Sequence, residues 1–85
     1  MIPLIDGFYL YCDRVRGRIY LRKKSEDGYF TFGQYRSIHS AITDAKDVIL
    51  IYRVAKQEGA SLEEVYTIET DIDLEFDKLE GRESW

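Results

Sequence analysis

The sequence predicts an α+β domain in which three N-terminal strands and one C-terminal strand form an antiparallel sheet packed by one long helix, in the order βββαβ. Two patterns support this prediction. Apolar and polar residues alternate with a period of two in residues 8–33 and again in residues 66–77, which is typical of strands. Between them, residues 38–55 repeat apolar residues at spacings of three and four, which indicates one face of a helix.

The composition fits one small folded domain. The chain has 85 residues, of which 45% are hydrophobic and 33% are charged, and this is enough apolar material for one core. We therefore expect a single domain over residues 1–85, with residues 78–85 as a flexible tail. No apolar run approaches the roughly 18–20 residues that span a bilayer, and Cys12 is the only cysteine. These features are typical of a cytoplasmic protein without disulfides and without a membrane span.

Residues 8–33 predict the three N-terminal strands, because aromatic and β-branched residues alternate between two faces. The apolar face holds Phe8, Leu10, Cys12, Ile19, Leu21, Phe30 and Phe32. The opposite face holds Tyr9, Tyr11, Asp13, Arg18, Tyr20, Arg22, Tyr29 and Thr31. A two-residue turn at residues 16–17 predicts that Cys12 lies opposite Leu21 and Asp13 opposite Tyr20. Arginine is unfavourable in such a turn, which leaves a longer loop open.

The second half of the chain predicts one helix and one more strand. Ser37 is expected to cap a long helix over residues 38–55, and Gly59 to stop it. Residues 61–64 resemble a capping box that starts one further helical turn. Residues 66–77 then alternate without interruption, which predicts the fourth strand. Its apolar face holds Tyr66, Ile68, Thr70, Ile72, Leu74 and Phe76, and its polar face holds Thr67, Glu69, Asp71, Asp73, Glu75 and Asp77.

Charge is segregated along the chain, whose net charge is −4. Residues 1–36 hold seven Lys/Arg and four Asp/Glu, a net of +3, whereas residues 37–85 hold five and twelve, a net of −7. On an extended strand, alternate side chains lie about 6.6–6.8 Å apart on one side. The acidic edge, which we define as Glu69, Asp71, Asp73, Glu75 and Asp77, would therefore form a row of charges that imitates nucleic-acid phosphates.

This row leads to the first functional hypothesis, a small non-enzymatic binding protein. Its acidic edge would engage the basic surface of a nucleic-acid-handling protein and inhibit or regulate it, in the manner of acidic inhibitors from phages and mobile elements. An alternative is a solvated edge strand that is charged only to prevent aggregation. A calcium-binding loop is disfavoured, because Phe76 stands where such a loop requires glycine.

The second hypothesis is a nucleic-acid-binding module. It uses the Tyr/Arg face, which we define as Tyr9, Tyr11, Arg18, Tyr20, Arg22 and Tyr29. Rings and cations on a sheet combine stacking with phosphate contacts, although tyrosines also simply suit a half-exposed sheet. A third possibility is a homo-oligomer in which the positive half of one copy meets the negative half of another.

A short run also resembles a known DNA-binding module. Residues 32–37, with the sequence FGQYRS, and Ala41 in the following helix resemble part of plant ethylene-response-factor DNA-binding domains and of the arm-binding domains of phage integrases. The resemblance covers residues 8–55 and implies three strands, a glycine-containing turn and a packed helix. In that family, arginines and aromatic residues of the sheet enter the major groove, which implies this role for Arg18, Tyr20 and Arg22.

Catalytic and metal sites are not predicted. His39 is the only histidine and has no partner motif, whereas a zinc site needs several ligands. Cys12 is expected to pack in the core. The sequence has no glycine-rich phosphate loop, nucleophile elbow or paired-carboxylate motif, so we expect neither enzymatic activity nor a cofactor.

Overall fold

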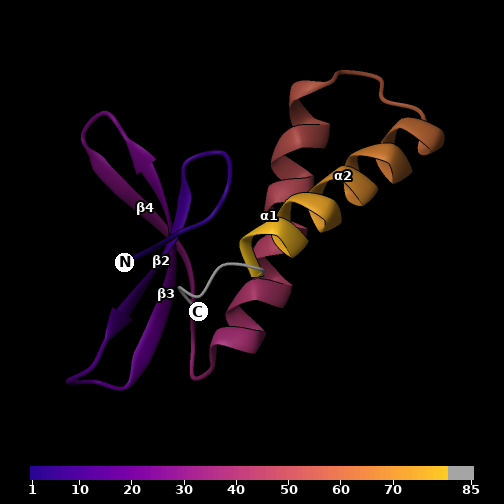
Figure 1. Ribbon diagram of the computed structural model, residues 1–85. Coiled ribbons are helices and arrows are strands. Elements are labelled where there is room, and N and C mark those ends of the chain that lie inside the picture. The colour runs from indigo at the N-terminus through magenta and orange to yellow at the C-terminus, as the bar shows by residue number, and fades with distance from the viewer. Residues whose placement is uncertain (81–85) are drawn as a thin grey trace.

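The computed structural model describes residues 1–80, which form one sheet and two helices (Figure 1). The strands are β1 (Ile2–Pro3), β2 (Phe8–Asp13), β3 (Arg18–Ser25) and β4 (Gly28–Tyr35), and the helices are α1 (Ile38–Lys56) and α2 (Leu62–Glu80). The sheet is antiparallel, with the strands in the order β1-β2-β3-β4. The predicted α+β class is confirmed, but the order βββαβ with one helix is wrong. Residues 78–80 end α2, and residues 81–85 of the predicted tail lie outside the described residues.

The predicted fourth strand is the helix α2, because its apolar residues also satisfy a helical spacing. Ile68, Ile72 and Phe76 are four residues apart, so a helix places them on one face as readily as a strand does. Ile72 and Phe76 are 1% and 0% exposed, whereas Tyr66 and Leu74 are 58% and 55% exposed. Half of the expected apolar face therefore points to solvent, as the helical period requires.

Both helices begin at the caps that the sequence predicts. The backbone N–H of Ser40 donates to Oγ of Ser37 at 3.1 Å at the start of α1. At the start of α2 the backbone N–H of Glu64 donates to Oγ of Ser61, and the N–H of Ser61 donates to Oε1 of Glu64, both at 3.2 Å. This reciprocal pair is a capping box, and it starts a full helix of 19 residues rather than a single turn.

The core lies between one face of the sheet and the two helices, which Figure 1 shows on the same side of the sheet. It consists of Phe8, Leu10 and Leu21 from the sheet, Ala41, Ile42, Ala45 and Ile49 from α1, and Ile72 and Phe76 from α2. Alanines on α1 let the helix backbone approach the sheet closely. The helix α1 contacts β3 and β4 of the sheet, and α2 packs against α1.

The β2–β3 register differs from the prediction by two residues. Cys12 pairs with Ile19 and Asp13 with Arg18, because the connecting loop has four residues. The carboxylate of Asp13 stabilises this loop by accepting hydrogen bonds from the backbone N–H groups of Val15 and Arg16 at 3.1 and 3.2 Å. A shift of two residues keeps every side chain on its predicted face. Cys12, however, is exposed, so the prediction that it packs in the core is wrong.

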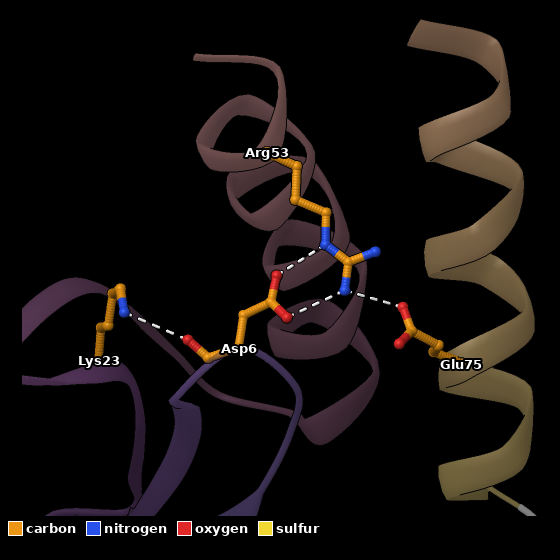
Figure 2. A network of polar contacts seen from close by, with 4 residues as sticks. All are labelled: Asp6, Lys23, Arg53 and Glu75. Carbon is orange, nitrogen blue, oxygen red and sulfur yellow. Dashed lines mark hydrogen bonds and ion pairs between the residues drawn. The ribbon is translucent and has the colours of Figure 1, made fainter. Parts of the chain in front are cut away.

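A polar network joins the β1–β2 connection to both helices (Figure 2). The Nε and Nη2 atoms of Arg53 in α1 donate to the two carboxylate oxygens of Asp6 at 2.7 and 2.9 Å. Nη2 also lies 2.9 Å from Oε2 of Glu75 in α2. The ammonium group of Lys23 donates to the backbone carbonyl of Asp6 at 3.2 Å. Arg53 therefore links three segments that are distant in sequence.

Replacing Asp6 with asparagine is expected to reduce the acid sensitivity of the fold. The hydrogen bond from Arg53 lowers the pKa of Asp6 below its usual value of 3.8. The contribution of Asp6 to stability is therefore complete above the unfolded pKa and is lost as the pH falls through the lower folded pKa. Asparagine tolerates the positive φ of 57° at this position.

Urea unfolding at about pH 7 and about pH 3 measures this contribution. Wild-type protein should lose more free energy of unfolding between the two pH values than Asp6→Asn does. Equal losses would show that the ion pair between Asp6 and Arg53 does not stabilise the folded state.

Candidate functional site

The acidic edge does not exist as a row, because its residues lie on α2. Consecutive members are two residues apart, which is about 200° around an α-helix. They therefore alternate between opposite sides of α2 instead of sharing one side. Two of them also have cationic partners within the protein, since Glu75 pairs with Arg53 at 2.9 Å and Asp73 with Lys46 at 3.6 Å. The structural premise of the first hypothesis is wrong. The function inferred from it stays an untested prediction without geometric support.

The Tyr/Arg face, in contrast, is assembled on one side of the sheet. Strand pairing places Tyr9 beside Arg22 and Tyr11 beside Tyr20, and places Tyr29 beside Lys24. All six residues of the set lie on the face opposite the helices. Figure 1 shows no described helix over this face, so we also call it the open face, although Tyr9 itself is only 8% exposed. The face therefore contains side chains from β2, β3 and β4.

Sequence reasoning missed Gln34, which also lies on the Tyr/Arg face. It pairs with Tyr20, whereas simple alternation from Thr31 assigns it to the core face. The cause is a β-bulge, in which Leu21 pairs with Gly33 and the next residue, Arg22, pairs with Thr31. The extra residue shifts the alternation of β4 by one position. A glycine inside an aromatic strand was the available sequence signal for this bulge.

Arg22 occupies the centre of the Tyr/Arg face. Its guanidinium carbon lies 4.1 Å from the ring centroid of Tyr29, 4.5 Å from that of Tyr11 and 5.1 Å from that of Tyr20. The three rings come from three different strands, so they hold the guanidinium group by cation–π attraction from several directions. Tyr11 and Tyr20 also pack on each other, with their centroids 6.4 Å apart.

The hydrogen-bond donors of Arg22 are not used within residues 1–80. Its Nε atom is buried without a hydrogen-bond partner, and the ion pairs of this part of the chain do not include it. A guanidinium group has five N–H donors. A donor that is removed from water without gaining an acceptor lowers the stability of the folded state. The buried Nε cannot be reached from outside, so the face presents a positioned cation whose terminal Nη groups would be the donors for an external acceptor, such as a phosphate or a carboxylate.

Charge on the molecule is divided between two sides. The open face has Arg18, Arg22 and Lys24 on β3, and the β2–β3 loop adds Arg14 and Arg16. On the far side of α1, α2 contains eight Asp/Glu residues against the single cation Lys78. Such a separation of charge orients a molecule as it approaches a polyanion, with the open face toward the polyanion and α2 away from it.

The described residues contain no stronger site elsewhere. Residues 1–80 include no group of three or more His, Cys, Asp or Glu side chains arranged to hold a metal ion. Tyr35 donates a hydrogen bond to the carboxylate of Asp44, and burial together with this bond raises the pKa of Tyr35. His39 lies nearby in the first turn of α1 and beside the same shallow hollow. Neither described helix is long and apolar enough to cross a membrane.

Comparison with known proteins adds no further constraint. No protein-family model, no curated protein and no solved structure matches this chain. The functional argument therefore depends on the geometry and charge of the open face.

Proposed function

We propose that this protein binds duplex DNA through the Tyr/Arg face of its sheet. The single observation that supports the proposal best is Arg22, a cation that three tyrosine rings position and that no acceptor in residues 1–80 satisfies. Nucleic acid supplies the acceptors that such a group needs, as phosphate oxygens or as base edges.

The placement of Arg22 favours a duplex over a single strand. Single-stranded nucleic acid is held chiefly by stacking bases on exposed aromatic rings. Here the guanidinium group already lies over the rings of Tyr11, Tyr20 and Tyr29, so a stacking base would compete with this contact, although Tyr11 and Tyr29 remain 41% and 52% exposed. Because Nε of Arg22 is buried, its terminal Nη groups are the donors that would bind a phosphate, or O6 and N7 of guanine in the major groove. The resemblance over residues 8–55 implies the same mode of binding.

The charge distribution is compatible with this mode although the net charge is −4. The acidic residues of α2 are separated from the open face by α1 and by the sheet (Figure 1). Salt shortens the range of charge interactions to about 10 Å at 0.1 M ionic strength. The open face can therefore approach DNA with little electrostatic repulsion between the phosphates and the acidic residues of α2. Because this face has few cations, we expect modest affinity.

A binding titration tests the proposal. Labelled duplex DNA, single-stranded DNA and RNA are each titrated at low salt by fluorescence anisotropy, and the titration is repeated at increasing salt. We expect the tightest binding to the duplex. The logarithm of its affinity should fall with the logarithm of salt concentration with a slope of about −2 to −3, because Arg18, Arg22 and Lys24 would neutralise about three phosphates.

The matched variants are Arg18→Glu/Arg22→Glu on the open face and Lys56→Glu/Lys78→Glu on the helices. Both doubles change the net charge equally, so a difference between them reports position and not total charge. Binding should be lost in the first double and largely kept in the second. Failure of wild-type protein to bind any of the three polymers, or an equal loss in both doubles, would refute the proposal.

A further inference from the structure

The outer edge of β4 has no strand partner within residues 1–80, because β4 is the last strand in the sheet order. Its eight residues, Gly28–Tyr35, include no charged side chain and no proline, in a chain that is 33% charged. Proteins usually protect an exposed edge with charge, proline or a very short strand. The opposite edge has such protection, since β1 has two residues and contains Pro3. The β4 edge has no charge, no proline and no shortened strand, and its one protective irregularity is the bulge between the residues paired with Leu21 and Arg22.

Exposed apolar side chains lie beside this edge on the helix side of the sheet. Phe30 is 62% exposed and Phe32 is 37% exposed. The ring of Phe32 lies 5.6 Å from that of Tyr52 of α1, which places both phenylalanines on the side of the sheet that α1 covers. The helix α2 does not cover this region, because it packs on the flank of α1 where Arg53 meets Asp6. The apolar side chains and the unpaired backbone therefore occur together.

We propose that the β4 edges of two copies of this chain pair antiparallel, forming a two-fold dimer with one continuous eight-stranded sheet. An antiparallel pair centred on Thr31 brings Phe30 of each copy beside Phe32 of the other, both on the helix side. Each contact occurs twice, as an isologous interface requires. This inference is independent of the proposed DNA binding, because it concerns a different surface.

Charge complementarity supports a second copy as the partner. In the same register, the turn that contains Glu26 and Asp27 comes opposite Arg36 of the other copy. Both acidic residues lie in the two-residue turn that precedes Gly28, so the arrangement brings this acidic turn as a whole near Arg36 of the other copy. The strand itself is neutral, so the two-fold arrangement places charges of opposite sign near each other at both ends of the strand pair.

The dimer has a defined geometry. The two-fold axis of an antiparallel strand pair is perpendicular to the sheet, so both Tyr/Arg faces lie on one side and both pairs of helices on the other. A head-to-tail association of the positive half of one copy with the negative half of another would be heterologous and would depend on charged surfaces instead of Phe30. The two arrangements therefore respond differently to the same substitution.

Sedimentation equilibrium in the absence of nucleic acid tests the proposal. Wild-type protein should change with concentration from a mass of 10.0 kDa to twice that mass. Phe30→Glu should weaken the dimer by about 100-fold, because it buries carboxylates against the ring of Phe32. The monomer should tolerate this change, since Lys23 pairs with Phe30 on β3. Leu74→Glu makes a similar change at a residue that is 55% exposed on α2 and should alter dimerisation less than about twofold.

Disulfide trapping tests the register. Opposite residues of an antiparallel pair have Cα atoms about 4.5–5.5 Å apart, which a disulfide can bridge. Thr31→Cys in a Cys12→Ser background should form a covalent dimer on mild oxidation, and Thr67→Cys on α2 in the same background should not. A monomeric wild-type protein at high micromolar concentration, equal effects of Phe30→Glu and Leu74→Glu, or equal trapping of the two cysteine variants would overturn the inference.

Discussion

Replacing Phe76 with alanine is expected to lower the free energy of unfolding by about 3–5 kcal/mol, the usual cost of removing a buried phenylalanine. Phe76 is 0% exposed and belongs to the core that α2 shares with α1 and the sheet. The ammonium group of Lys46 lies 5.6 Å from its ring centroid and loses this contact as well. Small domains have a total stability of about 5–15 kcal/mol, so the variant would be close to unfolding.

Urea unfolding measures this effect, and Leu74→Ala is the matched comparison. Leu74 and Phe76 would share the apolar face of a strand, and each would then be costly to truncate. On the helix, Leu74 is 55% exposed, so its truncation should cost less than about 1 kcal/mol. Similar losses for the two variants would contradict the helical arrangement of residues 66–77.

Replacing Arg22 with glutamine is expected to weaken duplex binding by about 10–100-fold, which corresponds to the 1–3 kcal/mol of one bidentate base contact. The salt slope should also become shallower by up to about one unit, because one cation is lost from the interface and fewer counterions are released. Arg22→Lys separates the contribution of the charge from that of bidentate hydrogen bonding, because lysine keeps the positive charge but lacks the planar guanidinium group. We expect this variant to keep the slope and still to lose about 10-fold in affinity.

The control for Arg22 is Arg14→Gln, which removes one charge from the exposed β2–β3 loop without disturbing the tyrosine rings. Its affinity should fall only slightly. Circular dichroism and urea unfolding establish that each variant remains folded, because Arg22 also contacts three rings of the sheet. If Arg22→Gln and Arg14→Gln had equal effects on binding, the centre of the open face would not be the interface.

The open face could be predicted from the sequence because it depends on local information. Alternate residues of a strand lie on opposite faces whatever its partner, so Tyr9, Tyr11, Tyr20 and Arg22 were assigned correctly even though the β2–β3 register was wrong by two. The stacking of Arg22 on three rings could not be predicted, because it requires the lateral order of β2, β3 and β4.

The conformation of residues 66–77 could not be predicted from the local sequence pattern. In residues 66–77 a period of two and a period of 3.6 share the positions of Ile68, Ile72 and Phe76, so the pattern is compatible with both structures. The choice between them depends on which surface is available to bury those side chains. Here α1 supplies it, with Lys46 and Arg53 beside the contact as partners for Asp73 and Glu75.

The local sequence was sufficient to predict the strands β2, β3 and β4, the long helix with its Ser37 cap, the capping box at Ser61, and the side of the sheet on which the residues of the Tyr/Arg face lie, but not β1. These features follow from spacing and from hydrogen bonds between residues that are close in the chain. Only the tertiary structure decided that the acidic segment is helical, that β4 contains a bulge, and that Arg22 meets three rings. Each of these outcomes depends on a contact between distant segments, and the apolar and electrostatic energy of that contact exceeds the small preference that the local pattern expresses.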